Sequence, residues 1–156
     1  MSQVTTAGLY DLPNGILIHA YAPTNAGFMI AVEPSVLLPR DAPVEQVGAE
    51  LIRVMKQKQP IRAAPNRSDF TDIGDPVLRA VGMRSWREVQ RNSQACVVEA
   101  GNGGFRFILR GGLRGARPFE HLNDRVLQVQ SSAPGVVGEA ARTALGLDLG
   151  PQGRAA

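Results

Sequence analysis

Residues 27–54 read GFMIAVEPSVLLPRDAPVEQVGAELIRV, and residues 104–145 read GFRFILRGGLRGARPFEHLNDRVLQVQSSAPGVVGEAARTAL. Both stretches open on Gly-Phe before an apolar run, reach a second apolar run, and continue with Ala-Pro, Val-Gly and a helical pattern. The matching pairs are Gly27-Phe28 and Gly104-Phe105, Ala42-Pro43 and Ala133-Pro134, and Val47-Gly48 and Val137-Gly138. Because a repeated order of features indicates a repeated structural unit, we predict two similar halves packed on each other.

The first copy predicts a β-hairpin, a third strand and a helix. Residues 16–22 alternate in part as a strand, and residues 28–33 return after a turn. Pro34 and Pro39 bracket a short apolar stretch, predicted to be an edge strand because proline cannot donate to a β-ladder. An amphipathic helix follows, with Asp41 as its expected cap. Its apolar face consists of Val44, Val47, Leu51, Val54 and Met55.

The second copy predicts the same order of elements. Strands are expected at residues 95–99, 105–109 and 125–129, and the first two are joined by a glycine-rich turn containing Asn-Gly. Ser132 is the expected cap of a last helix, which Gly146 ends. The apolar stripe of this helix consists of Val137, Ala140, Ala141, Ala144 and Leu145.

These elements predict an α+β fold with a largely antiparallel sheet covered by helices. The 156 residues fit a single domain spanning residues 1–156. Its similar halves are placed at about residues 9–58 and 78–147, with a linker over residues 59–77. Residues 76–92 are expected to form two short helices, the second opened by a capping box of Ser85 and Glu88.

Composition favours a soluble cytoplasmic protein. The chain is 44% hydrophobic and 20% charged, as is usual for folded globular domains. No apolar run has the length of a membrane span, and the first residues lack the pattern of a signal peptide. The single cysteine, Cys96, cannot form an internal disulfide, which suits a reducing compartment. It lies in an apolar run and is interpreted as an inert core thiol.

Charge is distributed unevenly along the chain. The net charge is +3, but residues 1–55 carry five acids and two arginines, and residues 56–117 carry twelve lysines or arginines and five acids. Arg106, Arg110, Arg114 and Arg117 lie near Phe105 and Phe107, a combination that can bind RNA by charge and stacking. The alternative is a solvated basic surface. Residues 111–115 lack the ending of a phosphate-binding loop, so nucleotide binding is not expected.

Asp69, Asp72 and Asp75 recur every three residues in the linker. Three interpretations remain open: aspartates that cap turns, contacts with a basic partner, and a cation site. The spacing differs from that of a calcium loop, and no glutamate closes the series. We therefore expect no metal site.

Catalytic signatures are weak. The two histidines, His19 and His121, lie far apart in sequence, and no metal-ligand spacing or nucleophile motif accompanies them. His19 points opposite Ile18 and Ala20, so it is expected to be exposed or to line a groove. A hydrolase with a spatially assembled site ranks below the binding functions, and the chain is predicted not to be an enzyme and to need no cofactor.

From Val81 onward the chain resembles small bacterial immunity proteins, the cytoplasmic partners of contact-dependent growth inhibition toxins. The features that carry the resemblance are Gly82, Ser85-Trp86 opening a short helix, the strand at residues 96–99, the glycine turn before Phe105 and the final helix. The resemblance implies stoichiometric inhibition through binding to a cognate toxin C-terminal domain, often a nuclease. This chain departs from the usual pattern in its charge, since inhibitors of basic nucleases are usually acidic.

The leading hypothesis is therefore a noncatalytic immunity protein that occludes the active site of its toxin. The expected toxin contacts are Asp69, Asp72 and Asp75, with Arg114 and Arg117 as the alternative of opposite charge. An RNA-binding module using the basic strip from Arg106 to Arg117 is the runner-up. No membrane partner is expected.

Overall fold

Antiparallel strands form one six-stranded open sheet in the order β3-β2-β1-β4-β5-β6. The computed structural model describes residues 5–27, 29–62, 76–85, 88–89, 94–101, 103–110 and 121–147. The strands are β1 (Thr5–Leu12), β2 (Gly15–Pro23), β3 (Met29–Leu38), β4 (Gln94–Gly101), β5 (Gly104–Arg110) and β6 (His121–Val129). This architecture confirms the predicted α+β class.

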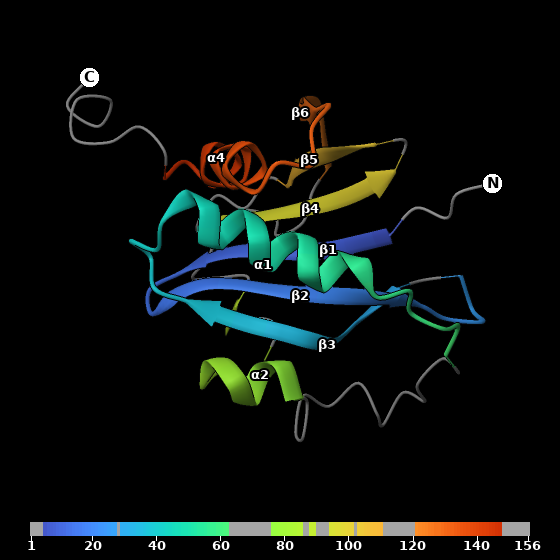
Figure 1. Cartoon of the computed structure of the whole chain (residues 1–156). Helices are drawn as coiled ribbons and strands as arrows, with labels where there is room; N and C mark the ends of the chain where they lie inside the picture. The colour runs from blue at the N-terminus through green and yellow to red at the C-terminus, as the bar shows by residue number, and fades with distance from the viewer. Residues whose placement is uncertain are drawn as a thin grey trace.

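The sheet consists of two similar halves that meet at its centre. β1, β2 and β3 are followed by α1 (Val44–Lys56), and β4, β5 and β6 are followed by α4 (Pro134–Ala144). β1 and β4 pair antiparallel in the middle, so each half extends outward from this pair in the same order. Figure 1 shows α1 and α4 in front of the strands, and α2 (Pro76–Val81) beside β3.

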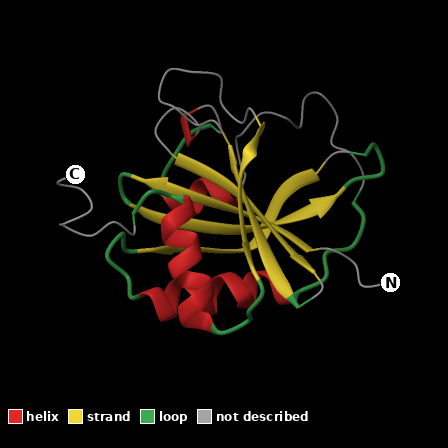
Figure 2. Cartoon of the chain, turned by 90° about the horizontal axis from the view of Figure 1, so that it is seen from above, coloured by secondary structure: helices red, strands yellow, loops and turns green. Residues whose placement is uncertain are grey.

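The main core lies between the sheet and the helices α1 and α4. Figure 2 shows these helices on one side of a strongly twisted sheet. Because side chains alternate along a strand, every second residue of β1, β2, β4 and β5 points into this core. The helices contribute the predicted apolar faces, and Val47, Leu51, Val54, Val137 and Ala141 are fully buried.

A second, smaller cluster covers part of the opposite face. Tyr10, Leu12 and Leu17 from β1 and β2 pack with Val77, Leu78 and Val81 of α2, and with Val89 and Ala95. The predicted capping box is present in part, since the Glu88 amide donates to Ser85 Oγ at 3.1 Å and the Arg84 amide donates to the Glu88 carboxylate. Asn14 Nδ2 donates to the Val81 carbonyl at 3.0 Å and ties the β1–β2 turn to α2.

Two elements of the first half differ from the sequence prediction. The central strand β1 was not predicted, and residues 29–38 form one strand rather than two. In β3, Ser35 pairs with His19 and Val32 pairs with Ala20, so Glu33 and Pro34 bulge out of the register. A proline in a bulge of an edge strand needs no ladder hydrogen bond, which explains why Pro34 does not end the strand.

The predicted helix caps are also wrong. α1 has Pro43 as its N-cap and α4 has Ala133, and neither has a side-chain cap hydrogen bond. Asp41 and Ser132 each precede these caps.

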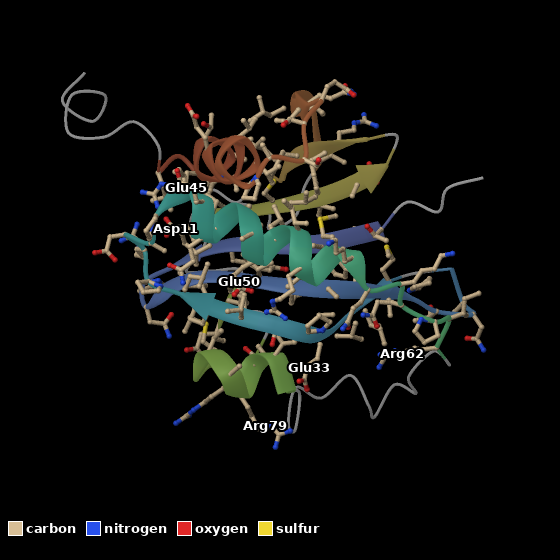
Figure 3. The ribbon with its side chains drawn as sticks, viewed as in Figure 1. Asp11, Glu33, Glu45, Glu50, Arg62 and Arg79 are labelled. Atoms are coloured by element: carbon tan, nitrogen blue, oxygen red, sulfur yellow. The ribbon has the colours of Figure 1, made fainter. Side chains whose placement is uncertain are left out.

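Glu45, in the first turn of α1, lies close to Gly135 in the first turn of α4. Figure 3 shows Glu45 at the start of α1 beside α4. A carboxylate in this position favours both helix N-termini electrostatically.

The predicted end of α4 is confirmed. Gly146 follows the helix with φ +74°, a conformation that residues with a Cβ rarely adopt. Its amide donates to the Thr143 carbonyl at 3.0 Å, and the Leu147 amide donates to the Arg142 carbonyl at 2.8 Å. Of the helices in the described ranges, none has both the length and the apolar character needed to cross a bilayer.

Candidate functional site

The residues predicted to contact a toxin lie outside the described residues. This holds for Asp69, Asp72, Asp75, Arg114 and Arg117. The predicted domain boundaries and these contacts therefore remain predictions. Three other regions carry features relevant to function: the sheet face around Arg106, the buried polar cluster around His19, and the surface at the end of α1.

Arg106 lies exposed on the sheet face opposite α1 and α4. It pairs across strands with Glu99, and its Nη1 lies 3.9 Å from Glu99 Oε1. Phe105 and Phe107 point the other way and are buried in the main core. The predicted stacking of bases on these two rings is therefore wrong, because alternation along β5 places the arginine and the aromatic rings on opposite faces.

His19 is fully buried on the same face as Arg106. The prediction that it is exposed or lines a groove is wrong, although its orientation opposite to Ile18 and Ala20 is as predicted. Its ring stacks on Tyr10 with 5.4 Å between centroids and meets the ring of Tyr21 edge-on at 4.7 Å. Gly8, its cross-strand neighbour on β1, leaves the space that the imidazole fills.

The hydrogen bonds of this cluster define its tautomer. His19 Nδ1 lies 2.9 Å from the Ala20 carbonyl oxygen, which can only accept, so Nδ1 carries the proton. In the neutral ring Nε2 is then an acceptor, and the Tyr10 hydroxyl lies 3.3 Å from it. The Tyr10 and Tyr21 hydroxyls lie 3.3 Å apart. Each polar group thus orients the next, which fixes the ring of Tyr21.

Two of the potentially reactive side chains in the described part of the chain, His19 and Cys96, are buried. His19 is buried and hydrogen-bonded, and Cys96 is buried in the main core, as predicted for a core thiol. The Cys96 thiol faces the Val97 carbonyl at 3.6 Å. Within the described ranges, no group of three or more His, Cys, Asp or Glu residues is arranged to hold a metal ion.

A cavity of about 700 Å³ lies at the end of α1. One wall is the last turn of the helix with Val54 and Met55, and another is the strand ends around Thr6 and Tyr21. Residues 57–61, named here the arch, complete the lining. The other lining residues are Thr5, Ala20, Pro23, Thr24 and Met29.

The arch is fixed at both ends. α1 holds its start, and beyond its end Arg62 forms a parallel bridge with Thr24. The Arg62 amide donates to the Pro23 carbonyl at 2.9 Å, and the Asn25 amide donates to the Arg62 carbonyl at 3.0 Å. Gln59 Nε2 donates to the Glu33 carbonyl at 3.4 Å, so the middle of the arch is tied to β3. Figure 3 shows Glu33 and Arg62 in the lower part of the view, below the C-terminal end of α1.

The surface around the arch is both apolar and cationic. Met29 is 42% exposed and Ile61 is 72% exposed, and both line the cavity. Lys56, Lys58 and Arg62 are exposed, and none of them forms a salt bridge with a residue in the described ranges. Sequence reasoning placed Ile61 and Arg62 in a linker, because Pro60 and the lack of apolar periodicity indicate only a loop.

Comparisons with known proteins find the fold in solved structures. No protein-family model matches the chain, and no curated protein matches it. A protein of unknown function from Neisseria meningitidis is similar over 92% of this chain and 94% of its own, with a TM-score of 0.66 and 15% identity. A chain of the CdiA-CT/CdiI toxin and immunity complex from Yersinia pseudotuberculosis is similar over 94% and 98%, with a TM-score of 0.65 and 12% identity. At these identities the likeness shows a shared fold.

Proposed function

We propose that this chain is the immunity partner of a contact-dependent growth inhibition toxin and neutralises the toxin by binding it in the cytoplasm. The observation that carries the proposal is the similarity of the fold, over nearly the whole of both chains, to a chain of a toxin and immunity complex. The resemblance of residues 81–147 to immunity proteins supports the same assignment. In this role the chain occludes the toxin active site and performs no chemistry itself.

The environment of His19 favours the role of inhibitor over the role of toxin for this chain. General acid–base chemistry requires a side chain that reaches the substrate within hydrogen-bond distance. The imidazole of His19 has no exposed surface, and its two nitrogens face the Ala20 carbonyl and the Tyr10 hydroxyl. It therefore acts as a structural group in the sheet.

The proposal predicts a toxin reading frame that ends just upstream of this gene, and co-expression with the C-terminal domain of that toxin tests it. We expect this chain to restore growth of cells that produce the toxin domain and to co-purify with it at a ratio of one to one. Toxin domains of unrelated sequence serve as controls, because immunity is specific to the cognate pair. Growth inhibition by this chain alone, relieved by the neighbouring protein, would assign it as the toxin instead.

Charge reversal in the linker is expected to weaken toxin capture. Complementary charges accelerate the encounter of two proteins and contribute to the retention of the complex. Replacement of Asp69, Asp72 and Asp75 together by lysine should raise the dissociation constant at least tenfold, measured by surface plasmon resonance. Glu139→Lys, an exposed acid on α4, is the matched control. An unchanged constant for the triple variant would remove the aspartates from the interface and leave Arg114 and Arg117 as the candidate contacts.

RNA binding remains the second candidate function because the Arg106 side chain is exposed. Without stacking by Phe105 and Phe107, binding at Arg106 rests on phosphate contacts. Affinity for bulk RNA should then fall steeply with salt, since neutralised phosphates release counterions. Filter binding between low and physiological salt distinguishes this function from toxin capture.

A further inference from the structure

The cavity beneath the arch has the dimensions and rigidity of a ligand site. Its volume of about 700 Å³ lies within the range that protein pockets use for small organic molecules. The Thr24–Arg62 bridge and the bond from Gln59 to the Glu33 carbonyl hold the arch in place. Tyr21 is also among the lining residues, but its ring packs on His19 on the sheet face away from α1. The wall formed by the arch is therefore the one whose position these bonds fix.

The described lining residues combine apolar side chains with several polar side chains and one lysine. Val54, Met55, Met29 and Ile61 supply aliphatic and thioether surface. Hydroxyl and amide groups come from Thr5, Thr6, Gln57 and Gln59. Among the described lining residues Lys58 alone carries a charge, and it forms no salt bridge with a described carboxylate.

We propose that this cavity binds a small amphiphilic carboxylate, with its apolar body against Val54, Met55 and Ile61 and its carboxylate near Lys58. The ammonium group of Lys58 complements the carboxylate, and the exposed Arg62 just beyond the arch adds to the positive field there. A free small molecule is favoured over a segment of a partner protein, because the volume of about 700 Å³ lies in the range of small-molecule pockets. The proposal is independent of the toxin-binding function.

Isothermal titration calorimetry of the full chain with decanoate, below its micelle concentration, tests the proposal. We expect saturable binding at one site. Lys58→Gln should weaken it at least fivefold, whereas Lys56→Gln, which alters an exposed lysine outside the lining, should change it less than twofold. Decyltrimethylammonium carries the same chain with the opposite charge and should bind at least tenfold more weakly than decanoate.

Methyl resonances of methionine report where decanoate binds. Met29 and Met55 line the cavity, whereas Met83 packs against the cluster around α2. The first two signals should shift during the titration, and the Met83 signal should stay in place. Three results would overturn the proposal: no saturable binding, equal affinity for the ammonium analogue, and equal effects of the two lysine substitutions. A shift confined to Met83 would also overturn it.

Discussion

Replacement of Gly48 by alanine is expected to destabilise the protein by about 3 kcal/mol or more, although alanine is the better helix former. A Cβ on Gly48 would lie 1.8 Å from the Pro134 carbonyl oxygen of α4. The contact is reciprocal, since a Cβ on Gly138 would lie 1.7 Å from the Val44 carbonyl oxygen of α1. Both obstacles are backbone atoms, so the helices must separate to accept either methyl group.

Gly135→Ala is the matched control for this prediction. Gly135 also lies in α4, but the nearest atoms to a Cβ there belong to Glu45 at 3.7 Å, an ordinary contact distance. This substitution should leave the stability within about 1 kcal/mol of wild type, because helix propensity then acts alone. Urea unfolding of the purified variants measures the differences. An unchanged free energy of unfolding for the Gly48→Ala variant would show that the two helices do not cross in backbone contact.

The same crossing shows what the sequence repeat could and could not predict. The Val-Gly pair occurs in both copies, and both glycines fall at the contact between α1 and α4. The repeat predicted two similar halves and the apolar face of each helix. It did not predict the crossing, because a glycine in a helical pattern is consistent with several roles and only the packed structure selects one.

The strand β1 escaped prediction for a related reason. Its sequence TTAGLYDL contains Gly8, and glycine in the interior of a strand weakens the pattern. The structure shows why glycine stands there, since a Cβ on Gly8 would lie 2.4 Å from His19 Nε2. Burial of His19 depends on this space, which sequence alone does not reveal, because Gly8 and His19 lie in different strands.

The two candidate binding surfaces differ in how far the sequence could identify them. The aspartates and arginines of the predicted interface were chosen as charged loop residues. The arch depends on tertiary contacts that bring Arg62 to Thr24 and Gln59 to the Glu33 carbonyl. No local pattern encodes these contacts, so residues 59–61, predicted as part of a linker, form part of the wall of a cavity.

Gly8 and His19 are expected to be strongly coupled in a double-mutant cycle. Gly8→Ala should cost about 2 kcal/mol or more, because the imidazole is held between Tyr10 and Tyr21 and cannot move aside. His19→Ala should cost about 3 kcal/mol, since it leaves a cavity and removes the hydrogen-bond partner of Tyr10. In the double variant the methyl group introduced at position 8 enters the space that the ring has left.

The double variant should therefore be more stable than the sum of the single effects predicts, by about 1.5 kcal/mol. Urea unfolding of the four proteins measures this coupling. Gly8→Ala combined with Gly135→Ala is the control pair, because the atoms nearest to a Cβ on Gly135 belong to Glu45 of α1 and its effect should add. Additivity of the Gly8 and His19 substitutions within about 0.5 kcal/mol would contradict direct contact between them. Strong coupling would instead establish that the imidazole of His19 occupies the space left by the missing side chain of Gly8.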